Sequence, residues 1–140
     1  MKKSVMISFV GTQEIDGDKE RVELMTEGSF YTKNDGYYVT YDESELTGLD
    51  GTTTMLKVQG KKVTMIRFGT NNTQLIFEKG HHHVSCYDTS YGTISVGVWA
   101  NDVTVDIDEN GGEIFADYNI DVDNNSVGKN SFRMQIRECQ

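Results

Sequence analysis

The chain has 140 residues, of which 36% are hydrophobic, and it carries a formal net charge of -9 with a pI near 4.7. This length is typical of one domain, so we expect a single domain over residues 1–140. The acidic balance disfavours nucleic acid and anionic membranes as partners, because binding to phosphates requires clustered lysine and arginine. The longest apolar runs are only a few residues and are far too short to cross a bilayer.

The cysteine content and the N-terminal segment predict a cytoplasmic protein. Cys86 and Cys139 are too few for a disulfide framework, and neither lies in a Cys-x-x-Cys spacing. The segment 4–10 alternates polar and apolar residues and has no cleavage-site pattern, so it is predicted to be the first strand rather than a signal peptide. No cofactor is expected.

Period-2 alternation dominates the chain, and no window holds a 3.6-residue apolar stripe. The pattern therefore predicts an all-β protein with little helix. The expected strands cover residues 3–12, 20–33, 36–44, 52–59, 61–69, 73–80, 82–89, 92–109, 112–123 and 127–138.

Short breaks rich in glycine and asparagine separate most of these strands. Examples are Asn34-Asp35-Gly36, Gln59-Gly60 and Asn110-Gly111-Gly112, where Gly and Asn accept positive φ. Strands joined by such turns are antiparallel neighbours. We therefore predict an antiparallel up-and-down meander of about 8–10 strands, closed into a barrel because closure removes exposed edges. A two-sheet sandwich is the alternative.

Alternation also predicts which side chains point inward. Leu56 and Val58 share a face, and the turn after them brings Val63, Met65 and Arg67 onto the same face. Arg67 is therefore expected inside the barrel.

Two further strips follow from the same rule. Val39, Tyr41 and Glu43 share the face that is predicted to be inward. Near the C-terminus, one face of residues 112–123 is predicted to pack with one face of residues 127–138. The side chains concerned are Ile114, Ala116, Tyr118, Ile120 and Val122, with Phe132, Met134 and Ile136, while Asp117, Asn119 and Asp121 are expected to face water.

An ordered series of short runs resembles the YwiB-like family of uncharacterised bacterial proteins over nearly the whole chain. The runs are Gly28-Ser29-Phe30-Tyr31, Tyr38-Val39-Thr40-Tyr41-Asp42-Glu43, Ile66-Arg67-Phe68-Gly69, Tyr87-Asp88-Thr89-Ser90-Tyr91-Gly92 and Asp117-Tyr118. The resemblance implies a lipocalin-like (calycin) barrel in a bacterial cytoplasm and no established activity. The His81-His82-His83 run is not a feature of that resemblance.

The inward polar residues Tyr41, Glu43, Arg67 and Tyr118 form the candidate ligand site. Burying an isolated charge is costly, so Glu43 and Arg67 are expected to pair, preferably through a bidentate contact. One hypothesis makes this set the polar floor of a ligand cavity, with Arg67 holding an anionic group. The alternative is a structural ion pair inside a barrel that is filled by its own side chains.

Two runs are candidates for metal binding. On a strand, His81 and His83 would share a face about 7 Å apart, although no Cys or carboxylate spacing nominates a third ligand. Asp106, Asp108 and Asn110, with Asp117 further on, copy the spacing of an EF-hand loop. Strand-like flanks and an ordinary hairpin turn at Asn110-Gly111 argue against a calcium site.

Three classes of function are open at this point. The first is a barrel that binds a small-molecule ligand, as a monomer or homodimer. The second is a protein-interaction or structural module with an aromatic patch around Phe30, Tyr31, Tyr37 and Trp99. The third, an enzyme, is not expected, because the chain has no phosphate loop, no nucleophile elbow and no histidine placed by a motif beside Ser or Cys.

Overall fold

The computed structural model describes residues 2–44, 50–69, 72–89 and 92–139, and within them the chain forms ten β-strands. The strands are β1 (Lys2–Ile15), β2 (Asp18–Lys33), β3 (Gly36–Asp42), β4 (Thr52–Gln59), β5 (Lys62–Gly69), β6 (Thr73–Phe77), β7 (His82–Thr89), β8 (Gly92–Asp108), β9 (Gly111–Val122) and β10 (Asn125–Glu138). No helix long and apolar enough to cross a membrane occurs in these residues.

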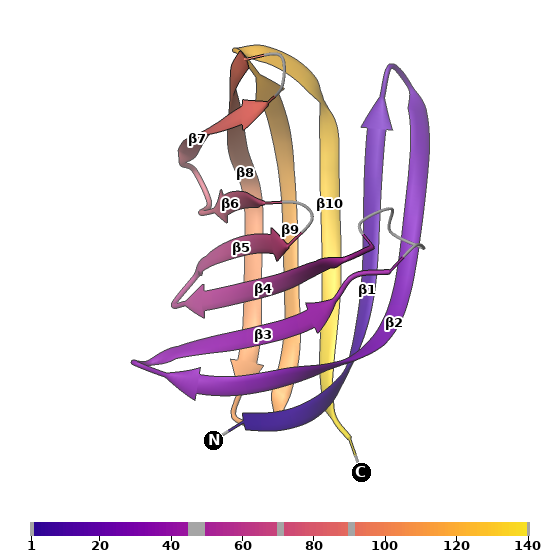
Figure 1. Cartoon of the computed structure of the whole chain (residues 1–140), viewed down its shortest axis with the longest axis vertical. Coiled ribbons are helices and arrows are strands. Elements are labelled where there is room, and N and C mark those ends of the chain that lie inside the picture. The colour runs from indigo at the N-terminus through magenta and orange to yellow at the C-terminus, as the bar shows by residue number, and fades with distance from the viewer. Residues whose placement is uncertain (1, 45–49, 70–71, 90–91, 140) are drawn as a thin grey trace.

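All ten strands belong to one antiparallel sheet, in the order β6-β5-β4-β3-β2-β1-β10-β9-β8-β7. The sheet curls into a nearly closed barrel, which confirms the predicted all-β meander (Figure 1). The first and last strands pair along most of their length, from Val5 opposite Glu138 to Glu14 opposite Lys129. The two edges of the sheet therefore come from the middle of the chain, at β6 and β7.

The junction between β6 and β7 differs from the sequence-based expectation. β6 ends at Phe77 rather than at residue 80, and a turn follows in which the His81 N–H donates to the Glu78 carbonyl at 3.0 Å. The Gly80 N–H donates to the Ala100 carbonyl of β8 at 3.1 Å. This turn binds to β8 instead of joining β6 and β7 in a hairpin ladder, so the two edges are brought together without pairing.

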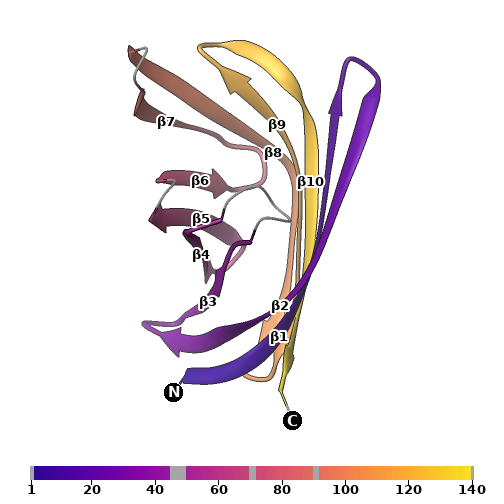
Figure 2. The same ribbon diagram turned by 45° about the vertical axis from the view of Figure 1, so that its right-hand side comes forward.

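Two halves of the sheet cross each other. Figures 1 and 2 show β3, β4, β5 and β6 running across the long strands β8, β9 and β10, while β1 and β2 bend and connect the two halves. Gly28 of β2 is opposite Val5 of β1 and immediately precedes the pairing of β2 with β3. A Cβ at Gly28 would lie 2.4 Å from the Thr40 carbonyl oxygen and 2.5 Å from Ile7 Cδ1. Only glycine allows the three strands to approach so closely.

The core fills the space between these halves and follows the predicted inward faces. Leu56, Val39, Ile114 and Met134 have no exposed surface, and Phe132 is 2% exposed. A bulge between Ala100 and Asp102 reverses the facing of β8, so that Val98 and Ala100 before it and Val103 after it are all buried. The alternation rule alone does not reveal this change of phase.

The predicted solvent face of β9 requires a correction. Asp117, Asn119 and Asp121 point away from the core, but each is partly buried, and Asn119 Oδ1 has no hydrogen-bond partner. Asp121 Oδ1 lies 3.2 Å from His82 Nε2. Neighbouring side chains on the outer face cover these residues, which alternation does not predict.

Replacing Gly28 by alanine is expected to lower the free energy of unfolding by about 1–3 kcal/mol, because the added methyl group overlaps backbone and a core side chain. Chemical denaturation measures the difference. Ser29→Ala, at the next position but on the opposite face, is the control and should change stability by no more than about 0.5 kcal/mol. An equally small effect of Gly28→Ala would contradict the close approach.

Candidate functional site

The candidate site begins with the inner face of β3 to β6, whose side chains lie in rows across the strands. One row holds Val39, Leu56, Met65 and Leu75, and all four belong to the core or pack against it. The next row is polar and contains Tyr41, Thr54, Arg67 and Thr73 in sequence across the four strands. Along each of these strands, the inner face therefore changes from apolar to polar between one inward-facing residue and the next.

Glu43 extends this polar region just beyond the end of β3. Its N–H donates to the Thr52 carbonyl at 2.8 Å and continues the ladder by one bond. The side chain is 7% exposed, close to the 3% of Tyr41. Both residues are inward, as predicted.

A cavity of about 190 Å³ lies against this polar region. It brings together the four predicted residues Tyr41, Glu43, Arg67 and Tyr118, which come from three separate parts of the sheet. The rest of its lining is contributed by β1, β2 and β10: Phe9, Gly11, Thr12, Gln13, Glu20, Val22, Asn130, Ser131 and Phe132. Gln13 and Glu20 are exposed, so this part of the lining opens to solvent.

The predicted direct pairing of Glu43 with Arg67 is wrong. None of the ion pairs formed by the described residues involves Arg67, and Arg67 Nε is buried without a hydrogen-bond partner. The reason is the register: β4 lies between the two residues, and Glu43 is two positions beyond the Tyr41 row. Strand spacing and residue rise put their Cα atoms roughly 12 Å apart. Alternation places both side chains on the inner face of the sheet. The sequence pattern therefore gave no reason to exclude the pair.

Thr54 is a further polar residue beside Arg67. It is fully buried, stands directly opposite Arg67 on the neighbouring strand, and its hydroxyl interacts with Tyr41 and Glu43. Arg67 Nε stays without a partner, and a buried polar group of this kind costs about 1–3 kcal/mol. Sequence reasoning missed Thr54, although its place in the alternation between Thr52 and Leu56 would have put it on the inner face.

The acid–base properties of the site follow from its burial. Burial raises the pKa of the Glu43 carboxyl, and the positive charge of Arg67 opposes that rise. Burial, and then the negative charge of Glu43, raise the pKa of Tyr41. Burial raises the pKa of Tyr118 to about 12 against the lowering effect of Arg67. At neutral pH both tyrosines are therefore neutral hydroxyl groups that can donate hydrogen bonds.

The histidine run divides between two faces. His83 Nε2 lies 3.0 Å from Glu78 Oε1, and His81 Nδ1 lies 4.0 Å from the same oxygen. His82 faces the other side, where it stacks on Trp99 at 4.4 Å between ring centroids and contacts Asp121. Across the described parts of the chain, no group of three or more His, Cys, Asp or Glu side chains is arranged to hold a metal ion.

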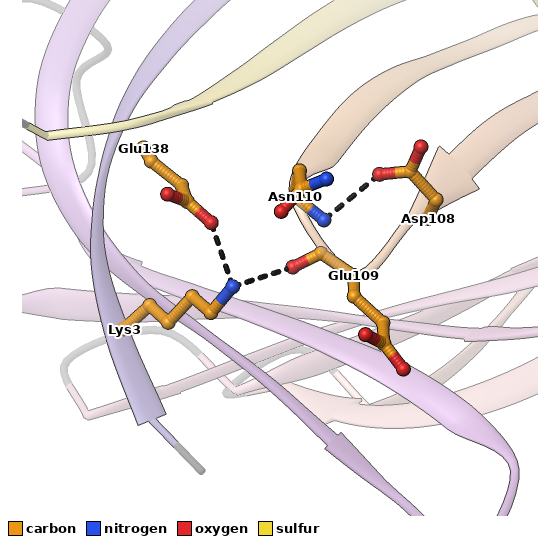
Figure 3. Close-up of polar contacts among 5 residues, drawn as sticks. All are labelled: Lys3, Asp108, Glu109, Asn110 and Glu138. Carbon is orange, nitrogen blue, oxygen red and sulfur yellow. Dashed lines mark hydrogen bonds and ion pairs between the residues drawn. The ribbon is translucent and has the colours of Figure 1, made fainter.

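The acidic turn is a β-hairpin rather than a calcium loop. β8 ends at Asp108 and β9 begins at Gly111, and the Asn110 N–H donates to Asp108 Oδ1 at 2.8 Å (Figure 3). The ammonium group of Lys3 donates to the Glu109 carbonyl at 2.9 Å and pairs with Glu138 at 2.6 Å. The positive charge beside this turn is therefore the Lys3 ammonium group.

The other oxygens of the EF-hand spacing lie apart from this turn. Asp117 is opposite Asp102, six residues along the strand from Asp108 and so roughly 20 Å away. Asp106 is paired with Glu113 within the ladder. The structure does not bring Asp106, Asp108, Asn110 and Asp117 together.

Comparison with known proteins identifies the family. The family model described as "Domain of unknown function (DUF1934)" matches residues 7–134, and the chain belongs to this family. The chain is 28% identical over 109 residues to the uncharacterized beta-barrel protein YwiB of Bacillus subtilis (strain 168), a match that covers 78% of this chain and 75% of that protein. The resemblance to YwiB-like proteins that the sequence indicates is confirmed.

A solved structure supports the fold. The crystal structure of ywiB protein from Bacillus subtilis superposes with a TM-score of 0.75 at 21% identity, covering 96% of this chain and 92% of that chain. At this level of identity the similarity establishes the shared barrel architecture.

The raised pKa of Glu43 predicts a specific pH dependence of stability. Because the folded-state pKa is above that of the unfolded chain, the contribution of Glu43 is fully present below the unfolded value of about 4.3 and is lost as pH rises through the folded value. Glu43→Gln should therefore raise the melting temperature at neutral and alkaline pH and give no gain in acid. Melting curves at several pH values test this expectation. The exposed Glu20→Gln is the control, and an equal gain for Glu43→Gln at all pH values would contradict the argument.

Proposed function

We propose that this member of the DUF1934 family is a lipocalin-like binding protein that holds a small amphipathic molecule, anionic at one end, in the interior cavity. In this proposal the protein acts in the cytoplasm, as a monomer or homodimer, and carries out no reaction on its ligand. The ligand's polar end would meet Arg67, Tyr41 and Tyr118, and its apolar part would lie against Phe9 and Phe132.

The single observation that carries the proposal is the buried Arg67 Nε on the cavity side of β5. This N–H is a donor, and it has no hydrogen-bond partner among the described residues. A polar ligand group in the cavity can supply the missing acceptor. Buried polar groups in folded proteins are nearly always hydrogen-bonded, which favours a bound partner at this place.

The cavity volume limits the ligand to a small molecule. An apolar cavity of about 150 Å³ is sufficient to hold benzene. A cavity of about 190 Å³ therefore suits a ligand of roughly one ring with a short polar substituent. The opening near the exposed Gln13 and Glu20 gives a longer ligand room to extend into solvent.

Two observations support the cellular context and the absence of catalysis. Both cysteines, Cys86 and Cys139, are free and exposed, as expected for a protein kept in a reducing compartment. Neither lines the cavity. The pKa values of the Tyr41 and Tyr118 hydroxyl groups, which do line the cavity, are raised, and this disfavours both groups as nucleophiles at neutral pH.

The alternative function, a protein-interaction module, was expected to use an exposed aromatic patch, but these aromatic residues do not form one. Phe30 is 1% exposed and belongs to the core, and Tyr37 stacks on it at 5.7 Å between ring centroids. Tyr31 stacks on Tyr38 at 4.9 Å. Trp99 is exposed but lies on β8, where His82 of β7 covers one face of its ring. An interaction role would need a different surface.

Native mass spectrometry of freshly purified protein tests the proposal directly. The expected result is a mass excess that corresponds to one small molecule and that disappears on denaturation. Thermal-shift measurements with a panel of small aromatic acids and their neutral analogues provide a second readout, because a ligand that binds only the folded state raises stability. A bare chain together with no stabilisation by any member of the panel would contradict the proposal.

Arg67→Met should weaken binding of an anionic ligand by about 10- to 150-fold, because a hydrogen bond to a charged group contributes about 1.5–3 kcal/mol. Arg133→Met is the matched control: Arg133 lies on the outer face, pairs with Glu113 and stacks over Phe115. Equal affinity losses in the two variants would show that the loss is not specific to the cavity.

A further inference from the structure

We propose that the cavity takes a monocarboxylate and that binding is coupled to the uptake of one proton, with Glu43 as the residue that becomes protonated. This inference rests on the proposed function and specifies its ligand class and its regulation by pH. It follows from the placement of one cation and one carboxylate on the same small cavity.

Arg67 provides the anion site. Its guanidinium lines the cavity, forms no ion pair among the described residues and has a buried, unpartnered Nε. A carboxylate accepts hydrogen bonds from a guanidinium in a planar, often bidentate, geometry. The neutral hydroxyl group of Tyr118 lines the same cavity and can donate to the same anion. The Tyr41 hydroxyl interacts with the Glu43 carboxyl.

The charges around Arg67 restrict the ligand to a single negative charge. Within the part of the chain that the structure describes, the titratable groups that line the cavity are Tyr41 from β3, Glu43 at its end, Arg67 from β5, Tyr118 from β9 and Glu20 from β2. Arg67 is the one cation among them, and the two glutamates carry the opposite charge. Arg67 can neutralise the single charge of a monocarboxylate, whereas the second negative charge of a dianion such as a phosphate monoester would meet no further cation in this lining.

Glu43 accounts for the coupling to protons. A ligand carboxylate on Arg67 would share the cavity with the Glu43 carboxylate, and two neighbouring carboxylates resist simultaneous ionisation. Glu43 is the group that takes the proton, because burial already raises its pKa. Once protonated, Glu43 gains an O–H and can donate to the ligand instead of repelling it. One proton enters from solvent, no covalent bond of the ligand is broken, and the net charge of the cavity is unchanged.

Isothermal titration of the wild-type protein with benzoate, across about pH 6 to 8.5, tests the inference, since a free carboxylic acid is ionised throughout this range. Above the folded-state pKa of Glu43, each unit of pH should weaken binding about tenfold, which is the dependence expected for uptake of one proton. Titration in two buffers with different ionisation enthalpies counts the protons independently and needs no variant. A count of zero would overturn the inference.

Two variants locate the proton. Glu43→Gln should bind benzoate with little dependence on pH and more tightly than the wild type at the alkaline end. Glu20→Gln removes the exposed carboxylate of the cavity opening and should keep the full wild-type dependence. Retention of that dependence in Glu43→Gln, or its loss in Glu20→Gln, would refute the assignment to Glu43.

The neutral analogue benzamide separates this inference from the proposed function. If benzoate binds the wild-type protein and this binding is lost in Arg67→Met, both the inference and the proposed function are supported. Binding of benzamide without benzoate would leave a small-molecule cavity in place and overturn the monocarboxylate. Binding of neither compound would overturn the inference and count against a cavity ligand of this size.

Discussion

The close approach of three strands at Gly28 is the constraint on which the rest of the structure depends. At this point β2 has the Ile7 side chain of β1 on one side and the Thr40 carbonyl of β3 on the other, with no room for a Cβ. β1 and β2 bend between the two halves of the sheet, and this bend turns β3 to β6 across β8 to β10 (Figure 2). Without it, a meander of ten strands would remain an open, twisted sheet with one hydrophobic face in water.

The same bend creates the polar site. The row that contains Tyr41, Thr54 and Arg67 lies next to the row of Val39 and Leu56, so the folding of one half over the other carries a strip of polar groups inside with the core. Tyr118 and Phe132, from the other half of the sheet, then line the same cavity as Arg67. Burial of the apolar rows stabilises this closure, because fully burying one such side chain contributes about 1.5–3 kcal/mol. The core can therefore offset the unfavourable burial of the polar row.

Local patterns carried most of the fold and most of the inward residues. Alternation around Leu56 and Val58, continued through the Gln59-Gly60 turn, placed Met65 and Arg67 correctly, because an antiparallel hairpin transmits its facing from one strand to the next. Alternation does not reveal the change of phase at Asn101, where a bulge shifts the facing of β8. It failed at β6 and β7, where a turn that binds to β8 replaces the expected hairpin.

The candidate site was predictable in its members but not in its contacts. Facing is a property of a single strand, so Tyr41, Glu43, Arg67 and Tyr118 could each be assigned to the interior. Contact between Glu43 and Arg67 depends on the register of two ladders and on the strand between them, which alternation does not encode. Buried groups without partners, such as Arg67 Nε, arise only when the whole barrel is assembled.

Because Glu43 and Arg67 do not form an ion pair, a structural pair does not explain why these two charged residues are inside the barrel. A buried bidentate ion pair would be a sufficient structural reason for both residues, since each would neutralise the other. In this barrel the guanidinium on β5 and the carboxylate just beyond the end of β3 instead line the same cavity, and each meets the other only through longer-range attraction. Such an arrangement weakens the fold relative to an apolar interior. Departures of this kind from local packing rules concentrate at functional sites, which favours an interior that is adapted to a charged ligand over one that is adapted to stability alone.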